Sequence, residues 1–377
     1  MSPKLYVAPD ERQLLSRFWR SASGFWLGGT AWVAWSMIAF LIATILLQLG
    51  VQYWLNFWNR DFFDAIERRN GPDLLAQTII FAPLVAASVA LAVVSVWGRM
   101  TMQRKWREWL SHHLYEYWLQ NDRHRRLQFM AGEHQNPEYR IAEDARLATD
   151  LPIDLALGLF SALLTAITFI GILLSVGGAI RVSAFDMSVT VPGYLVIAVS
   201  LYSILLSSAT MTIGRRLTQV IEDYKKAEAD LRSVGAHLRE SDTPSKGMTE
   251  ERRVIHAALD QVIARWLALC WQLMRTTLVS HTNLLLTPFI ALLLCTPKYV
   301  DGAMTLGEVV QASAAFVLVQ GAFNWITDNY GRIAEWMSSA NRVAYLLLAL
   351  DQTDRLEPPS PDQREQAEAA DGGAPSP

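Results

Sequence analysis

The 377-residue sequence is poor in charged residues. Only 18% of its residues are Asp, Glu, Lys or Arg, while 51% are hydrophobic, and an ordinary soluble domain has about 25% charged residues. This deficit indicates a protein that lies largely in lipid. The formal net charge of −3 does not provide the basic surface that nucleic acid requires, so we expect no nucleic-acid partner.

Cysteines and catalytic motifs are also scarce. The two cysteines, Cys270 and Cys295, are far apart in the sequence and lack metal-ligand spacing, so we expect neither a metal site nor a disulfide scaffold. The phosphate-binding pattern G-x-x-x-x-G-K-[ST] is absent, as are HExxH, GxSxG and CxxC. We therefore expect that this sequence does not hydrolyse ATP by itself, is not an enzyme and has no cofactor.

Long apolar segments are what the sequence has in abundance. A helix needs about 20 mainly apolar residues to cross a bilayer, and six stretches qualify. They cover residues 25–48, 78–97, 155–176, 191–213, 278–295 and 309–326. The sequence therefore predicts six transmembrane helices. The sixth contains Gln311, Gln320 and Asn324, which predicts a face turned to a cavity or a partner helix because amides are costly in lipid.

Positive charge is distributed unevenly among the connections. Residues 99–152 contain nine Lys and Arg and residues 214–277 contain eleven, whereas Arg181 is alone between spans three and four and Lys298 is alone between spans five and six. The positive-inside rule then places both long connections and both termini in the cytoplasm. We expect a multi-pass protein of the bacterial inner membrane.

Apolar residues continue at helical spacing into both long connections. Trp106, Leu110 and Leu114 extend the second span, and Ile221 and Tyr224 extend the fourth. Polar turns are expected near residues 132–137 and 241–247. Six spans above two long helical hairpins predict an all-α membrane protein with the architecture of an exporter-type ABC transmembrane domain, over residues 1–352. Residues 353–377 contain only one large apolar residue, Leu356, and are expected to form a disordered tail.

Three segments carry a family resemblance. Residues 53–66 read YWLNFWNRDFFDAI, residues 136–144 read NPEYRIAED, and residues 228–240 contain EADLR followed by LRE. These segments resemble the SbmA/BacA peptide transporters and their relatives with a fused ATPase, the BacA-like and peroxisomal-type ABC half-transporters. After residue 240 the sequence continues with SDTP, which departs from the pattern of the relatives that have an ATPase.

The segment at residues 136–144 is the most specific of the three. Its matches to the family's cytoplasmic-turn motif are Asn136, Pro137, Arg140, Glu143 and Asp144. A local role is also predicted, with the asparagine as helix N-cap and the proline at the first helical position. The aromatic residues at 53–66 are open to a second interpretation as well, because Trp and Tyr are common at any membrane interface.

The resemblance implies a homodimeric importer of peptides that is driven by the proton gradient. The alternative is a membrane subunit of an ABC transporter whose ATPase is a separate or lost polypeptide. The alternative draws support from residues 305–342, which look closer to the ATPase-fused relatives, and from the end of the sequence near the point where their ATPase would begin. A purely structural scaffold has no positive signal.

Proton coupling requires titratable groups that face a cavity. The candidates are Glu116, Glu228, Glu308 and Glu335, because the helices that carry them are expected to line one cavity. The competing interpretation is that each acid only offsets neighbouring bases. Asp328 is a weaker candidate, because Arg332 lies one turn on and would hold it ionised.

Overall fold

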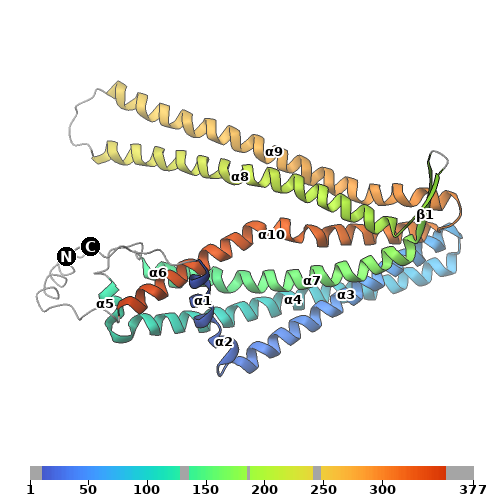
Figure 1. Ribbon diagram of the computed structural model, residues 1–377, viewed down its shortest axis with the longest axis horizontal. Helices are drawn as coiled ribbons and strands as arrows, with labels where there is room; N and C mark the ends of the chain where they lie inside the picture. The colour runs from blue at the N-terminus through green and yellow to red at the C-terminus, as the bar shows by residue number, and fades with distance from the viewer. Residues whose placement is uncertain (1–10, 128–135, 185–186, 241–247, 354–377) are drawn as a thin grey trace, which may run out of the picture. The chain divides into compact units, whose positions relative to one another are not determined.

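The computed structural model describes residues 11–127, 136–184, 187–240 and 248–353, and most of them are helical (Figure 1). The long helices are α3 (Ala31–Glu67), α4 (Gly71–Leu119), α7 (Ala145–Gly177), α8 (Tyr194–Glu240), α9 (Met248–Val300) and α10 (Leu306–Thr353). The short helical elements are α1 (Glu11–Ala22), α2 (Gly24–Leu27), η1 (Gln120–Asp122), α5 (Arg123–Leu127), α6 (Pro137–Tyr139) and η2 (Arg140–Asp144). The expected turn at 241–247, most of the turn at 132–137 and the expected tail from residue 354 lie outside the described residues.

The six long helices are each long and apolar enough to cross a membrane. The prediction of an all-α membrane protein with six transmembrane helices is therefore confirmed. Each helix also exceeds the roughly 20 residues that a bilayer needs. Helix α8 has 47 residues and α9 has 53, and at 1.5 Å per residue both continue well beyond the hydrocarbon region.

Two predicted span boundaries are wrong. The first span does not begin at Phe25, because the chain is extended at Gly28 and the long helix α3 begins only at Ala31. The fourth does not begin at residue 191, because residues 187–192 form a strand. The strands β1 (Ala179–Ala184) and β2 (Met187–Pro192) pair antiparallel, with Ala184 opposite Met187. An apolar strand and an apolar helix give the same summed hydropathy, so the hydropathy pattern did not reveal this hairpin.

The chain divides into two compact units. Unit 1 comprises residues 1–51, 85–161 and 329–377, and unit 2 comprises residues 52–84 and 162–328. The buried cluster of unit 1 includes Leu14 and Phe18 from α1, Trp106 from α4 and Leu347 from α10. Leu14 and Phe18 are four residues apart and so lie on one face of α1, which explains why this short amphipathic helix packs on its neighbours.

Within unit 2, helices α8 and α9 run side by side (Figure 1). The buried side chain of Gln272 in α9 donates to the carbonyl of Ile213 in α8 at 2.8 Å. Further along the pair, Arg265 of α9 forms an ion pair with Asp223 of α8 at 3.2 Å. Helices α8 and α9 are therefore joined by direct polar contacts.

Two polar side chains of the sixth span, Gln320 and Asn324, have partners in unit 2. Gln320 donates to the Asn283 carbonyl oxygen of α9 at 3.3 Å. Asn324 accepts from Ser207 of α8 at 3.2 Å. The partner helices of these two side chains are thus helices of the same chain, whereas the buried amide of Gln311 has no hydrogen-bond partner among the described residues.

Candidate coupling site at the ends of helix α10

The segment Asn136–Asp144 begins with a left-handed turn. Asn136 has φ +68° and ψ +60°, and Pro137 occupies the first helical position of α6. A residue before proline is kept out of the right-handed helical region, and asparagine is one of the few residues that tolerate the left-handed one. The predicted cap is therefore confirmed in position, but the Asn136 side chain makes no capping hydrogen bond.

The next turn, η2, is a π-helix, a form that is often found at functional sites. It carries Asp144, whose side chain is only 2% exposed, towards α10. Arg342 of α10 binds one oxygen of this carboxylate through two nitrogens, at 2.8 and 2.7 Å. Arg140 donates to the backbone carbonyl of Arg342 at 3.2 Å. Two of the family-motif residues therefore tie the turn to α10.

The other face of the same segment is open. Glu138, Tyr139 and Ala142 are exposed, the Tyr139 residue to 63%. Glu143 forms an ion pair with Arg146, which lies on the same helical surface. The segment thus has an inner face bound to α10 and an outer face available to a partner.

A second carboxylate joins α4, α7 and α10 in unit 1. Asp154 of α7 accepts from Arg332 at 2.6 Å and from Gln103 at 2.8 Å. The expected pairing of Asp328 with Arg332 is therefore replaced by a contact between helices. Spacing of one turn permits the local pair, but the tertiary arrangement places Asp154 within reach.

A third carboxylate lies at the last turn of α10, well beyond the predicted sixth span at residues 309–326. Asp351 accepts two hydrogen bonds from Arg17 of α1, at 2.8 and 2.9 Å, and one from the Tyr117 hydroxyl of α4. The Arg123 guanidinium lies 4.0 Å from the centre of the Tyr117 ring. Burial alone raises the pKa of Asp351, but the hydrogen bonds from Arg17 and Tyr117 outweigh burial and hold that pKa below its ordinary value.

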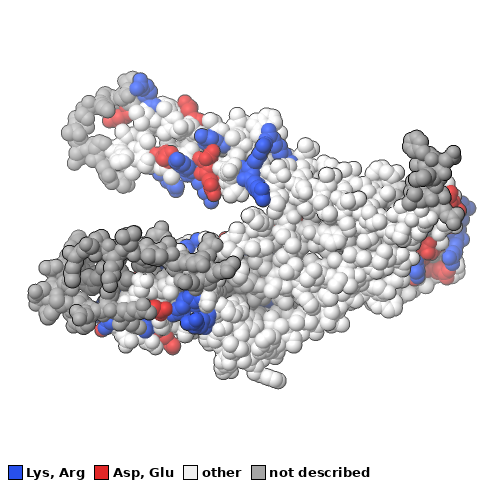
Figure 2. All heavy atoms as spheres, viewed as in Figure 1, with Lys and Arg blue, Asp and Glu red and all other residues white. Residues whose placement is uncertain are grey.

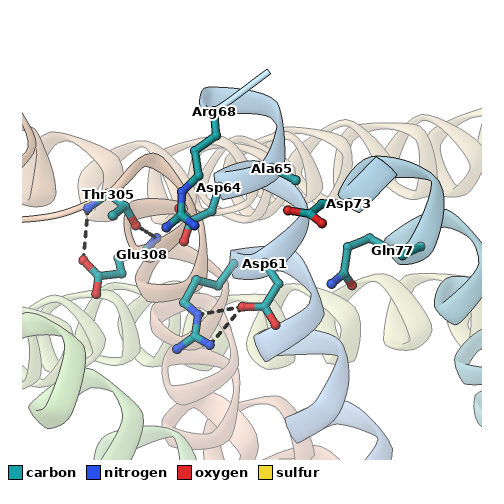
Figure 3. A pocket seen from close by; sticks show the side chains of 10 residues that line it. Asp61, Asp64, Ala65, Arg68, Asp73, Gln77, Thr305 and Glu308 are labelled. Atoms are coloured by element: carbon teal, nitrogen blue, oxygen red, sulfur yellow. Dashed lines mark hydrogen bonds and ion pairs between the residues drawn. The ribbon is translucent and has the colours of Figure 1, made fainter. Parts of the chain in front are cut away.

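The opposite end of α10 is capped by acids of unit 2, beside an open cavity of about 430 Å³ (Figure 3). Thr305 and Glu308 form a reciprocal capping box, with hydrogen bonds of 3.0 and 3.2 Å. Asp64 and Glu67 of α3 accept from the first backbone N–H groups of α10 at 2.9 and 3.0 Å. Three carboxylates therefore stabilise the positive end of the α10 dipole.

This joint depends on Gly307. A Cβ atom at this position would lie 2.1 Å from the Arg60 carbonyl oxygen and 2.4 Å from the Asp64 carboxylate. The aromatic-rich segment 53–66 lies within α3, and Asp64 near its end binds the first turn of α10. The N-terminus of α10 therefore packs against this part of α3.

The structure places the four proton-coupling candidates in different settings. Glu116 of α4 and Glu335 of α10 are exposed in unit 1. Glu228 of α8 is half-buried and accepts from the Tyr224 hydroxyl at 2.7 Å. Glu308 serves the capping box. It lies in unit 2, whereas Glu335 lies in unit 1.

The carboxylates that join α10 to its neighbours, Asp144 apart, were missed by the sequence reasoning. One signal was present for Asp351, because an acid in the last turn of a helix is unfavourable beside the negative end of the dipole and calls for a cationic partner. No comparable signal marks Asp154, since its partners lie on two other helices.

Comparison with known proteins agrees with this architecture. Residues 25–287 match the family described as ABC transporter transmembrane region 2. The chain is 26% identical over 346 residues to the inner membrane ABC transporter ATP-binding protein YddA of Escherichia coli, covering 88% of this chain and 60% of YddA. It is 20% identical over 353 residues to the chloroplastic ABC transporter D family member 2 of Arabidopsis thaliana, covering 90% of this chain and 47% of that relative.

Six spans with long helical extensions agree with the exporter-type ABC transmembrane architecture expected from the sequence. The family match covers most of the chain, so the protein belongs to the ABC transporter transmembrane region 2 family. The chain spans about half to three-fifths of the length of these curated relatives.

Proposed function

We propose that this chain is the membrane half of a homodimeric ABC-type transporter of the bacterial inner membrane, and that an ATPase acts on it through the Asn136–Asp144 turn. The observation that carries the proposal is the division of this turn into two faces. The outer face offers Glu138 and Tyr139 to a partner, and the inner face joins Asp144 to Arg342 of α10.

This arrangement suits a mechanical connection. Asp144 is buried, and a buried carboxylate that binds a guanidinium through two nitrogens is geometrically specific. A displacement of the outer face would therefore be passed to α10 rather than absorbed by side-chain rotation. The same helix is held at Asp154 and Asp351 by two further polar contacts, so α10 would respond as one element.

Transport in inverted membrane vesicles tests the proposal. Uptake of a labelled peptide would be measured with ATP and the proton gradient varied independently, and the peptide is chosen on the family resemblance. We expect transport to require ATP, to survive an uncoupler and to fall in Glu138→Lys, which reverses a charge on the outer face. Transport that does not depend on ATP and stops when the uncoupler is added would contradict the proposal.

Dimerisation and orientation have their own tests. A single six-span body supplies half of an exporter-type cavity, so we expect cross-linking in the native membrane to give dimers. Only monomers under conditions that retain transport would contradict this. With both termini in the cytoplasm, a cysteine that replaces Tyr139 should resist an impermeant thiol reagent added to intact cells, and strong labelling would overturn the orientation.

The second candidate is a proton-driven peptide importer, and one observation favours it. Glu228 is half-buried and shares a hydrogen bond with Tyr224 on the cytoplasmic extension of α8. In this case Glu228→Gln would abolish gradient-driven uptake, because glutamine keeps the volume but cannot titrate. Tyr224→Phe is the matched control, since it removes the same hydrogen bond and leaves the carboxylate able to titrate.

A further inference from the structure

A groove of about 700 Å³ lies between α8 and α9 in unit 2. Two arginines and one tryptophan, Arg216, Arg275 and Trp271, are among the residues that line it. All three residues are exposed, Trp271 to 56%. The groove therefore combines two positive charges with an accessible aromatic ring.

The groove lies where the two helices leave their apolar segments. Arg216 follows the last apolar residues of the fourth span, at Ile213, by less than one helical turn, and Arg275 precedes the start of the fifth span, at Leu278, by the same interval. In Figure 2, the α8–α9 pair is white in the half nearer β1, and blue atoms begin where that half ends. This change from apolar to charged residues indicates the depth of lipid headgroups, where tryptophan is enriched.

Neither guanidinium of the groove is neutralised. Within the described part of the chain, Arg216 and Arg275 form no ion pair. Arg265 differs, because it pairs with Asp223 further along the same two helices. Two uncompensated guanidiniums at a membrane surface attract an anion, and their planar donor sets suit the oxygens of a phosphate.

The groove is also preformed. Gln272 lies among the lining residues, is 4% exposed and donates to the Ile213 carbonyl of α8 at 2.8 Å. This buried bond holds α9 at a set distance from α8 between the two arginines. A ligand would therefore bind without first having to order the two helices, which lowers the cost of association.

We propose that this groove binds the headgroup of an anionic phospholipid. The phosphate lies between Arg216 and Arg275, and the glycerol region contacts the Trp271 ring. A lipid is favoured over a soluble phosphate ester because the site adjoins two apolar spans on the side that the charge pattern predicts to be cytoplasmic. Basic pockets between transmembrane helices on that side commonly bind anionic headgroups. The site does not depend on how transport is driven.

Native mass spectrometry of the full chain in detergent tests the site, with dioleoyl-phosphatidylglycerol as the probe and dioleoyl-phosphatidylcholine as the neutral reference. We expect the wild type to retain the anionic lipid preferentially. Arg216→Gln and Arg275→Gln should each lower its apparent affinity about fivefold, and the double variant should lose the preference. Arg216→Lys and Arg275→Lys should retain part of the preference for the anionic lipid, and this retained binding would show that the variants are folded.

Arg215→Gln is the matched control, because Arg215 carries the same charge at the same depth but does not line the groove. It should change the affinity little. An equal loss in Arg215→Gln, or an unchanged preference in the double variant, would overturn the proposal. Displacement of the lipid by an excess of inorganic phosphate would overturn the assignment to lipid and point to a soluble phosphate ester.

Discussion

Arg342 and Asp144 form an ion pair with unequal exposure. The Arg342 side chain is 42% exposed, the Asp144 side chain is 2% exposed, and the second oxygen of Asp144 has no hydrogen-bond partner among the described residues. The carboxylate therefore depends on the guanidinium much more than the guanidinium depends on the carboxylate. Water can replace the lost partner only on the arginine side.

This asymmetry predicts unequal costs for the two substitutions. Arg342→Met leaves a buried charge unpaired and should lower the free energy of unfolding by about 3 kcal/mol. Asp144→Asn leaves a guanidinium that water can reach and should cost about 1 kcal/mol. Thermal unfolding in detergent gives the comparison. Glu143→Gln is the control, since its exposed pair with Arg146 should contribute little to stability, and a loss as large as that of Arg342→Met would contradict the assignment.

The contact of Asp351 with Arg17 predicts a pH dependence. The pKa of Asp351 is lower in the folded protein than its ordinary value, so the folded state favours the ionised form. The stabilisation is complete above the unfolded pKa of about 4 and is lost as pH falls towards the folded value. Wild type should therefore be more stable than Asp351→Asn at pH 7, by about 2 kcal/mol, and the difference should shrink below about pH 4. A difference that stays constant with pH would show that the charge is not the cause.

Gly307 should be the least replaceable glycine of α10. An alanine there would force the Arg60 carbonyl and the Asp64 carboxylate away from the helix terminus, so we expect Gly307→Ala to lower the midpoint of thermal unfolding clearly. Gly321→Ala is the control on the same helix, because nothing lies within 4 Å of an added Cβ there. It should be neutral or slightly stabilising, since alanine favours helix by about 1 kcal/mol. Equal changes of the unfolding midpoint in the two variants would contradict the close packing of Gly307 against α3.

Capping and proton coupling at Glu308 can be separated. If the carboxylate acts only in the capping box, Thr305→Ala should cost about 1 kcal/mol. Glu308→Gln should cost less, because glutamine can keep the capping hydrogen bond, and neither variant should affect transport more than slightly. If Glu308 also carries a proton, Glu308→Gln alone should abolish uptake. Unfolding and uptake measured on both variants distinguish these outcomes.

The sequence by itself determined the number of spans, because each span is a local sum of hydropathy over about 20 residues. It also indicated helical hairpins beyond the spans, because apolar residues such as Trp106 and Leu110 recur at helical spacing and are indeed buried. The turn at Asn136 and Pro137 was predictable for a similar reason, since its constraints are steric and act between neighbouring residues.

The tertiary structure decided the partners of the charged and polar side chains. Spacing alone paired Asp328 with Arg332, but Arg332 reaches Asp154 on another helix. Glu308, one of the proton-coupling candidates, also caps α10 together with Thr305. The β1–β2 hairpin likewise escaped the hydropathy pattern. An ion pair between helices depends on which helix faces meet across long sequence separations, and no local pattern of residues contains that information.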